Sequence, residues 1–149
     1  MLICSDKIHC DLVYPGPGHL PIASLGPEVS HRVVTLMAPS KTFNIPGLRC
    51  SFAIVQDRGL RARVAGDHGG DFAEVNNLGL VAAIAAYRDG QPWLDEVLRY
   101  LESNRTIVVD FIRRELSGVT TVAPEATYLA WLDFRQSGID QDPYEFFLR

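Results

Sequence analysis

The 149-residue chain carries 14 Lys and Arg against 18 Asp and Glu, a net charge of −4 with no basic cluster of the kind that binds nucleic acid. Its hydrophobic content of 47 % and charged content of 21 % are those of an ordinary globular protein with a core. No apolar run approaches the roughly 20 residues of a membrane span, and the first residues do not resemble a signal peptide. These features exclude nucleic-acid and membrane partners and predict a soluble, cytoplasmic protein.

The cysteine content is low and irregular. Cys4, Cys10 and Cys50 form neither an even disulfide framework nor the paired spacing of a zinc site. We therefore expect reduced thiols, as in cytosolic proteins. A metal site built from Cys4, His9 and Cys10 is the alternative, but no second group of ligands completes it.

Three short apolar segments in the first half predict the strands of one sheet. They are residues 2–5, which end at Asp6, residues 33–37 and residues 51–55. Residues 33–37 are continuously apolar, so we expect that strand to be buried on both faces beneath helices. About a dozen residues with a Pro–Gly turn join it to the third strand, too few for a helical crossover, and we expect these two strands to be antiparallel.

Helical patterns alternate with these strands and dominate the middle of the chain. The predicted helices are residues 27–30, 57–64, 78–88, 91–116 and 144–148. The glycine-rich segment 66–70 predicts a joint, and Asn76 or Asn77 can cap helix 78–88. That helix is apolar nearly all round, so we expect other protein to cover it. The long helix should bury one stripe and end at Gly118; the stripe comprises Leu94, Val97, Leu98, Leu101, Val108, Phe111, Ile112 and Glu115/Leu116.

Residues 119–122 and 127–134 predict two further strands, with Tyr128 and Trp131 as strand and core residues. The fold class is α/β, with a mixed sheet in residues 1–90 and the long helix plus an incomplete small α+β unit in residues 91–149. The first strand has no polar lead-in and the last helix is cut short, so we expect further sequence at both ends.

The segment 38–49, APSKTFNIPGLR, holds one of only two lysines, Lys41, the other being Lys7. Position alone favours an ordinary solvent-facing lysine in a loop. Ligands of open α/β sheets, however, bind at the carboxyl ends of parallel strands, where Asp6 and Lys41 would be neighbours. A lysine amine can hold the aldehyde of pyridoxal phosphate as a Schiff base while a carboxylate keeps the pyridine nitrogen protonated. Arg49 could pair with the phosphate.

Four segments resemble a known family, the class I/II aminotransferase superfamily of fold type I. They are SDKIHCDL (5–12), APSKTFNIPGLR (38–49), NNLGLVAAIAAYRDG (76–90) and PEATYLAWLDFR (124–135). The branch they resemble most is that of the MalY/PatB-like C–S lyases, the cystathionine β-lyases and cysteine-S-conjugate β-lyases. The resemblance implies a partial fold-type-I structure and a pyridoxal 5′-phosphate cofactor.

The resemblance also implies a role for each candidate site residue. Lys41 would be the Schiff-base lysine and the base that moves the Cα proton, and Asp6 would pair with the pyridine nitrogen. His9 lies where most aminotransferases have a tyrosine that bonds the ring hydroxyl. Arg49 would contact the phosphate, and Ser40 would help to form the phosphate cup. Taken alone, His9 is more often a hydrogen-bonded loop histidine and Asp6 a turn cap.

The chain departs from the family pattern at two positions and in length. Lys7 stands where the branch usually has Glu, and Ala38 where many relatives have a phosphate-binding Ser or Thr. The chain corresponds to well under half of a family subunit, without the glycine-rich phosphate segment, the ring-stacking aromatic residue or the arginine that binds the substrate carboxylate.

The predicted function is that of a fragment of a C–S β-lyase, whose full enzyme converts a cysteine conjugate such as cystathionine to thiol, pyruvate and ammonia. The alternatives are an aminotransferase of the same superfamily and a truncated, non-catalytic remnant. The full-length family is expected to form homodimers, and the isolated chain is expected to have little or no lyase activity.

Overall fold

The computed structural model describes residues 1–16, 18–66 and 75–148. Its first sheet contains β1 (Ile3–Asp6), β2 (Val33–Met37) and β3 (Phe52–Val55) in that order. β1 runs parallel to β2, with Asp6 opposite Leu36, and β2 runs antiparallel to β3. The mixed sheet and the antiparallel third strand are therefore confirmed.

The strands of this sheet are less buried than predicted. In β2, Val33 and Thr35 are buried but Leu36 is 37 % exposed, and β1 alternates half-buried with exposed residues. This alternation is the pattern of a sheet covered on one face, because successive side chains point to opposite faces. The prediction that β2 is buried on both faces is wrong for the described residues.

The predicted helices are present with small shifts at their ends. They are α1 (Pro27–Ser30), α3 (Arg58–Gly66), α4 (Asn77–Asp89), α5 (Gln91–Glu115) and α6 (Pro143–Phe147), and three short turns of helix were not predicted: η1 (Ile22–Ser24), α2 (Pro39–Thr42) and η2 (Pro46–Leu48). Asn76, rather than Asn77, caps α4, since its side chain accepts a hydrogen bond from the Gly79 N–H at 2.8 Å. The predicted joint at 66–70 lies outside the described residues from position 67 onward.

The two long helices expose more apolar surface than an isolated globular chain normally does. α4 buries Gly79 and Ala83 but leaves Leu78 73 % exposed, so the expected cover is not supplied by the described residues. In α5 the buried positions are Leu94, Val109 and Ile112. Val108 and Phe111, predicted for the buried stripe, are exposed, because the stripe that meets the rest of the chain is narrower and rotated toward Val109.

The second sheet is a two-stranded ribbon of β4 (Thr120–Thr121) and β5 (Leu132–Asp133), paired antiparallel. Both strands are shorter than predicted. Thr127, at the start of the second predicted strand, has a left-handed backbone with φ 62° that does not fit an extended strand. Tyr128 and Trp131 are 47 % and 84 % exposed, so their prediction as strand and core residues is wrong.

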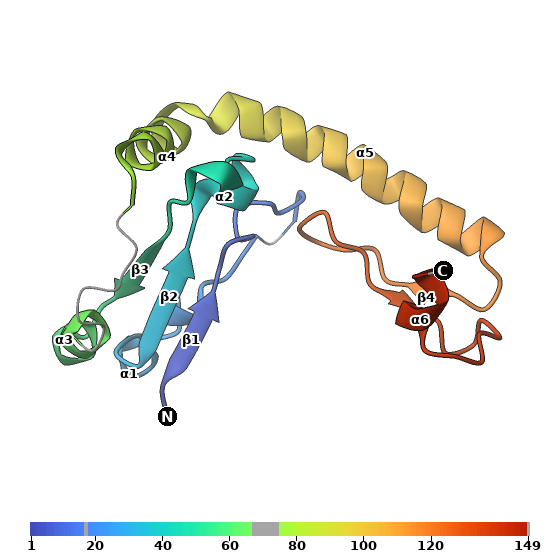
Figure 1. Ribbon diagram of the computed structural model, residues 1–149, viewed down its shortest axis with the longest axis horizontal. Helices are drawn as coiled ribbons and strands as arrows, with labels where there is room; N and C mark the ends of the chain where they lie inside the picture. Colours follow the sequence, from blue (N-terminus) through green and yellow to red (C-terminus); the bar gives the residue numbers. More distant parts are fainter. Residues whose placement is uncertain (17, 67–74, 149) are drawn as a thin grey trace.

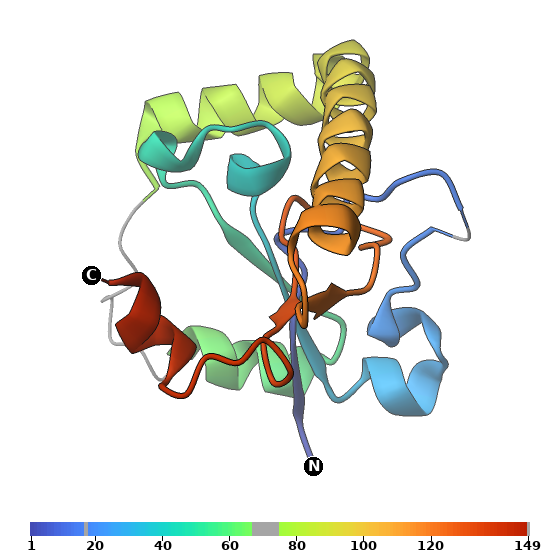
Figure 2. The same cartoon turned by 90° about the vertical axis from the view of Figure 1, so that its right-hand side faces the viewer.

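The long helix α5 links the two sheets (Figure 1). The chain after β4 then returns toward the first sheet, where Val13 forms an isolated antiparallel bridge with Ala126. Turned by 90°, the chain shows α3 near the amino end of β1 and α4 near the opposite end of the sheet (Figure 2). Within the described residues, no helix is both long and apolar enough to cross a bilayer.

Candidate functional site

The candidate site lies at one edge of the first sheet. Because β1 and β2 are parallel, their carboxyl ends lie side by side, and Asp6 is the last residue of β1. The chain leaves β2 through Ala38 and enters α2 directly, with Pro39 in the first turn, where a missing N–H has no cost. Figure 1 shows α2 at the carboxyl end of β2. Lys41 therefore lies in a short helix, and the prediction of a loop lysine is wrong in that respect.

A partly buried hydrogen bond joins the two segments that carry the candidate residues. Thr42, which is 1 % exposed, donates from Oγ1 to Asp11 Oδ2 at 2.9 Å. Thr42 follows Lys41 directly, and Asp11 belongs to the segment that follows β1. The bond thus fixes α2 against the segment after β1, which contains His9.

A hollow of about 400 Å³ opens beside the end of β1. Its lining residues are Asp6, Lys7, Ile8, His9, Cys10, Val13, His19 and Ala126. Asp6 Oδ1 accepts a hydrogen bond from the Ile8 N–H at 3.2 Å, and the Lys7 N–H continues the β1–β2 ladder by donating to the Leu36 carbonyl at 2.9 Å. Asp6 and His9 therefore share this hollow, while Lys41, in α2 beyond the end of β2, is not part of the lining.

His9 is held by residues from the far end of the chain. Its Nδ1 lies 3.1 Å from Thr127 Oγ1, and its ring meets the Tyr128 ring edge-on with centroids 5.3 Å apart. The Thr127 N–H donates to the Leu12 carbonyl at 2.6 Å, and the Tyr14 hydroxyl donates to the Thr127 carbonyl at 2.7 Å. His9 is thus a hydrogen-bonded histidine that also lines the hollow.

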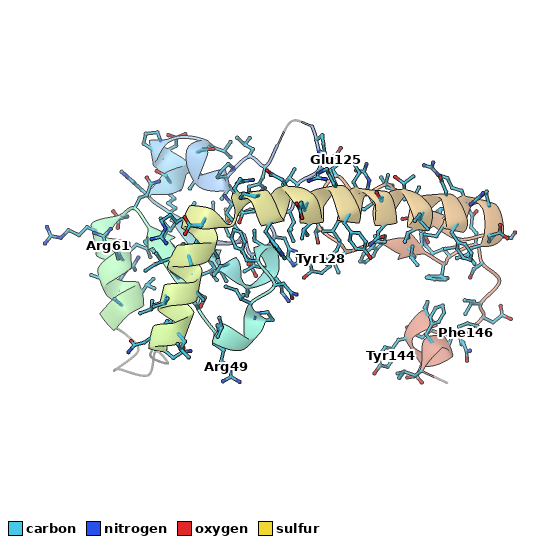
Figure 3. All side chains as sticks on the ribbon, turned by 90° about the horizontal axis from the view of Figure 1, so that it is seen from above. Arg49, Arg61, Glu125, Tyr128, Tyr144 and Phe146 are labelled. Atoms are coloured by element: carbon cyan, nitrogen blue, oxygen red, sulfur yellow. The ribbon has the colours of Figure 1, made fainter. Side chains whose placement is uncertain are left out.

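The two predicted phosphate contacts lie elsewhere. Arg49 is exposed, follows η2 with a left-handed φ of 49°, and extends away from the body of the chain (Figure 3). Ser40 is half-buried in α2, and its carbonyl accepts a hydrogen bond from the Ile45 N–H at 3.1 Å. The structure does not bring either residue into the lining of the hollow with Asp6 and His9.

Two groups near the site have pKa values above their ordinary range. Burial raises the pKa of the Cys10 thiol, with a further contribution from the Asp11 carboxylate beside it. Burial also raises the pKa of Tyr87 to about 12, with smaller contributions from Asp11, Cys10 and Cys50. All three cysteines carry free thiols, and no group of three or more potential metal ligands occurs among the residues that the structure describes.

Sequence reasoning missed Asp11, Thr42 and Thr127. All three lie inside the segments 5–12, 38–49 and 124–135, so the motifs contained them. Their partners are 31 and 118 residues away along the chain, and no local pattern identifies such pairs.

These features define a mixed α/β protein whose polar side chains gather at the carboxyl ends of two parallel strands. A family model, "Aminotransferase class I and II", matches residues 1–145. The chain therefore belongs to the class I and II aminotransferase family.

Individual curated relatives are similar to this chain over most of its length. It is 41 % identical over 138 residues to cystathionine beta-lyase PatB of Bacillus subtilis, an alignment that covers 92 % of this chain and 36 % of PatB. It is 34 % identical over 142 residues to protein MalY of Escherichia coli, covering 94 % and 36 % of the two chains. The chain thus spans about a third of the length of the curated relatives it matches.

Solved structures agree with this placement. The crystal structure of OvoB matches 99 % of this chain and 39 % of its own, with a TM-score of 0.92 and 47 % identity. The pyridoxal-phosphate-bound C–S lyase of Staphylococcus hominis matches 99 % and 38 %, with a TM-score of 0.85 and 37 % identity. The α/β fold-type-I prediction is confirmed.

Proposed function

We propose that this chain supplies the lysine-bearing part of a pyridoxal-phosphate-dependent C–S β-lyase that acts on a sulfur amino acid such as cystathionine. The observation that carries the proposal is the position of Lys41 in α2, the short helix that follows β2, at the same end of the sheet at which the parallel strand β1 ends in Asp6. The similarity to PatB and to the S. hominis C–S lyase supports the lyase branch.

The residues at the sheet edge fit this cofactor chemically. Asp6 offers a carboxylate for the pyridine nitrogen, His9 an imidazole for the ring hydroxyl, and Lys41 a primary amine for the aldehyde. Asp6 and His9 line one hollow, and Asp6 Oδ2 has no hydrogen-bond partner among the described residues. Ser40 and Arg49 remain proposed phosphate contacts, although Arg49 would have to turn inward to reach the hollow.

When bound, the cofactor withdraws electrons from the substrate so that the Cα proton becomes acidic. The chain's own part is to hold and move that proton. We assign this to the Lys41 amine, which would take the proton from Cα while the Asp6 carboxylate would keep the pyridine nitrogen protonated. The Cβ thiolate would then leave and take up a proton to give the thiol. The unsaturated amino acid that remains would be hydrolysed by water to pyruvate and ammonia.

Several features of the whole enzyme belong to the same proposal. The division into residues 1–90 and 91–149 is supported by the two separate sheets joined by α5. A homodimer is proposed for the full-length family. A cytoplasmic location remains a prediction, supported by the three free thiols.

Transamination is the second candidate, because the matching family model is that of the aminotransferases. It would use the same Asp6 and Lys41. Product analysis separates the two reactions: the lyase releases a thiol from cystathionine, whereas the aminotransferase transfers the amino group to an added keto acid.

The test uses the two lysines of the chain as a matched pair. Purified wild-type protein, K41R and K7R are each mixed with pyridoxal phosphate, reduced with borohydride and digested for mass spectrometry. We expect the pyridoxyl label on Lys41 in wild type and K7R, and its loss in K41R. Equal labelling of Lys7 and Lys41, or none at Lys41, would refute the proposal. Thiol release from cystathionine by wild type but not by K41R would exclude the non-catalytic remnant.

A further inference from the structure

Thr127 occupies a backbone conformation that is rarely found for its residue type. Its φ of 62° is left-handed, a conformation that is unfavourable for a β-branched side chain. The strain is offset locally, because the Thr127 N–H donates to Leu12 and its carbonyl accepts from the Tyr14 hydroxyl. A residue that several contacts hold in an unfavourable backbone conformation is often found at a functional site.

The group that Thr127 holds is the His9 imidazole. The Thr127 hydroxyl lies 3.1 Å from His9 Nδ1 and has no other hydrogen-bond partner among the described residues. If the hydroxyl donates to Nδ1, its hydrogen is satisfied. If Nδ1–H donates to the hydroxyl oxygen instead, the hydroxyl hydrogen of Thr127 has no acceptor within the described chain.

A second contact keeps the imidazole from rotating away. The Tyr128 ring meets the His9 ring edge-on, with the two planes at 64°. Thr127 and Tyr128 both come from the segment that returns from the second sheet, so the orientation of His9 depends on residues more than a hundred positions away.

We propose that Thr127 is a positioning residue that donates its hydroxyl hydrogen to His9 Nδ1 and thereby fixes His9 as the neutral tautomer with the proton on Nε2. Nε2–H is then the only ring donor of His9, on a side chain that lines the hollow with Asp6. Only the use of this donor toward a cofactor ring hydroxyl rests on the proposed function. The tautomer itself does not.

The readout is the nitrogen spectrum of His9 in the complete chain without cofactor. The chain has four histidines, so ¹⁵N-histidine labelling with an H9Q variant assigns the signal. Spectra are recorded at about pH 8.5, roughly two units above the ordinary histidine pKa, so that the ring is neutral. T127V removes the hydroxyl but keeps the branched shape, and T127S keeps the hydroxyl.

We expect wild type and T127S to show the Nε2–H tautomer, and T127V to lower the ratio of Nε2–H to Nδ1–H by about fivefold, the effect of one ordinary hydrogen bond. If T127V does not fold, T127G serves instead, because glycine tolerates the left-handed backbone, and it should give the same shift. An Nδ1–H tautomer in wild type, an unchanged ratio in the folded hydroxyl-free variant, or loss of the preference in T127S would overturn the proposal. Failure of Lys41 labelling leaves this result unaffected and refutes only the proposed function.

Discussion

The hydrogen bond between Thr42 and Asp11 should be among the more costly single interactions to remove from the site. Thr42 is fully buried, and its hydroxyl donates to a carboxylate at 2.9 Å, whereas Asp11 is only half-buried. Hydrogen bonds to charged groups contribute about 1.5–3 kcal/mol, and the partial exposure of Asp11 favours the lower end of that range. T42V preserves the side-chain volume, so we expect it to lower the free energy of unfolding by about 2 kcal/mol, most of it from the lost bond.

A double-mutant cycle isolates the pairwise contribution. Urea unfolding of wild type, T42V, D11A and the double variant, followed by circular dichroism, should give a coupling free energy of about 1.5 kcal/mol. T106V is the matched control, because Thr106 makes its hydrogen bond to the Glu102 carbonyl on the exposed face of α5; the expected change is within about 0.5 kcal/mol. A coupling below about 0.5 kcal/mol would refute the inference that this bond fixes α2 against the loop after β1.

Three further predictions concern α4 and the second sheet. G79A would place a Cβ atom 2.5 Å from the Leu48 carbonyl oxygen, so α4 must shift; we expect a loss of about 1–3 kcal/mol in urea unfolding, and no loss would refute this contact. Tyr87 should ionise near pH 12 in an ultraviolet titration, because burial favours the neutral phenol, and Y87F should lack this step. The contribution of the raised Tyr87 pKa to the free energy of unfolding is present below pH 10 and is lost as the pH rises through about 12. R135Q should raise the pKa of Asp133 from about 2 toward 3.8 in a carboxyl NMR titration, since the side-chain hydrogen bond from Arg135 lowers that pKa. The contribution of the lowered Asp133 pKa to the free energy of unfolding is present above pH 3.8 and is lost as the pH falls through about 2.

The elements were predictable where one local signal dominates. Three features needed no distant contacts for their prediction. Asn76 marks the start of α4, Pro92 marks the first turn of α5, and the short connection between β2 and β3 makes these strands antiparallel. The failures occur where burial depends on what packs against an element. Leu36 and Phe111 are apolar residues in regular elements, yet both are exposed, because apolar character alone does not say which face is covered.

The parallel pairing at the candidate site was predictable, but the hydrogen bonds around it were not. Parallel pairing of β1 and β2 brings Asp6 and Lys41 to one edge, as the order of elements implied. The strained Thr127 had no such signal: threonine in a β-branched, aromatic run predicts a strand, and only the contacts with Leu12, Tyr14 and His9 reverse that preference.

The candidate site draws residues from both sides of the proposed division at residue 90. Lys41 and Asp6 come from the first part, whereas Thr127, which holds His9, comes from the second. A backbone bridge between Val13 and Ala126 connects the same two segments. The sheet edge can therefore present its lysine and carboxylate without residues 91–149, but the imidazole beside them is oriented only when α5 returns the chain to the first sheet. The long helix thus contributes to the site through geometry, although none of its own residues lines the hollow.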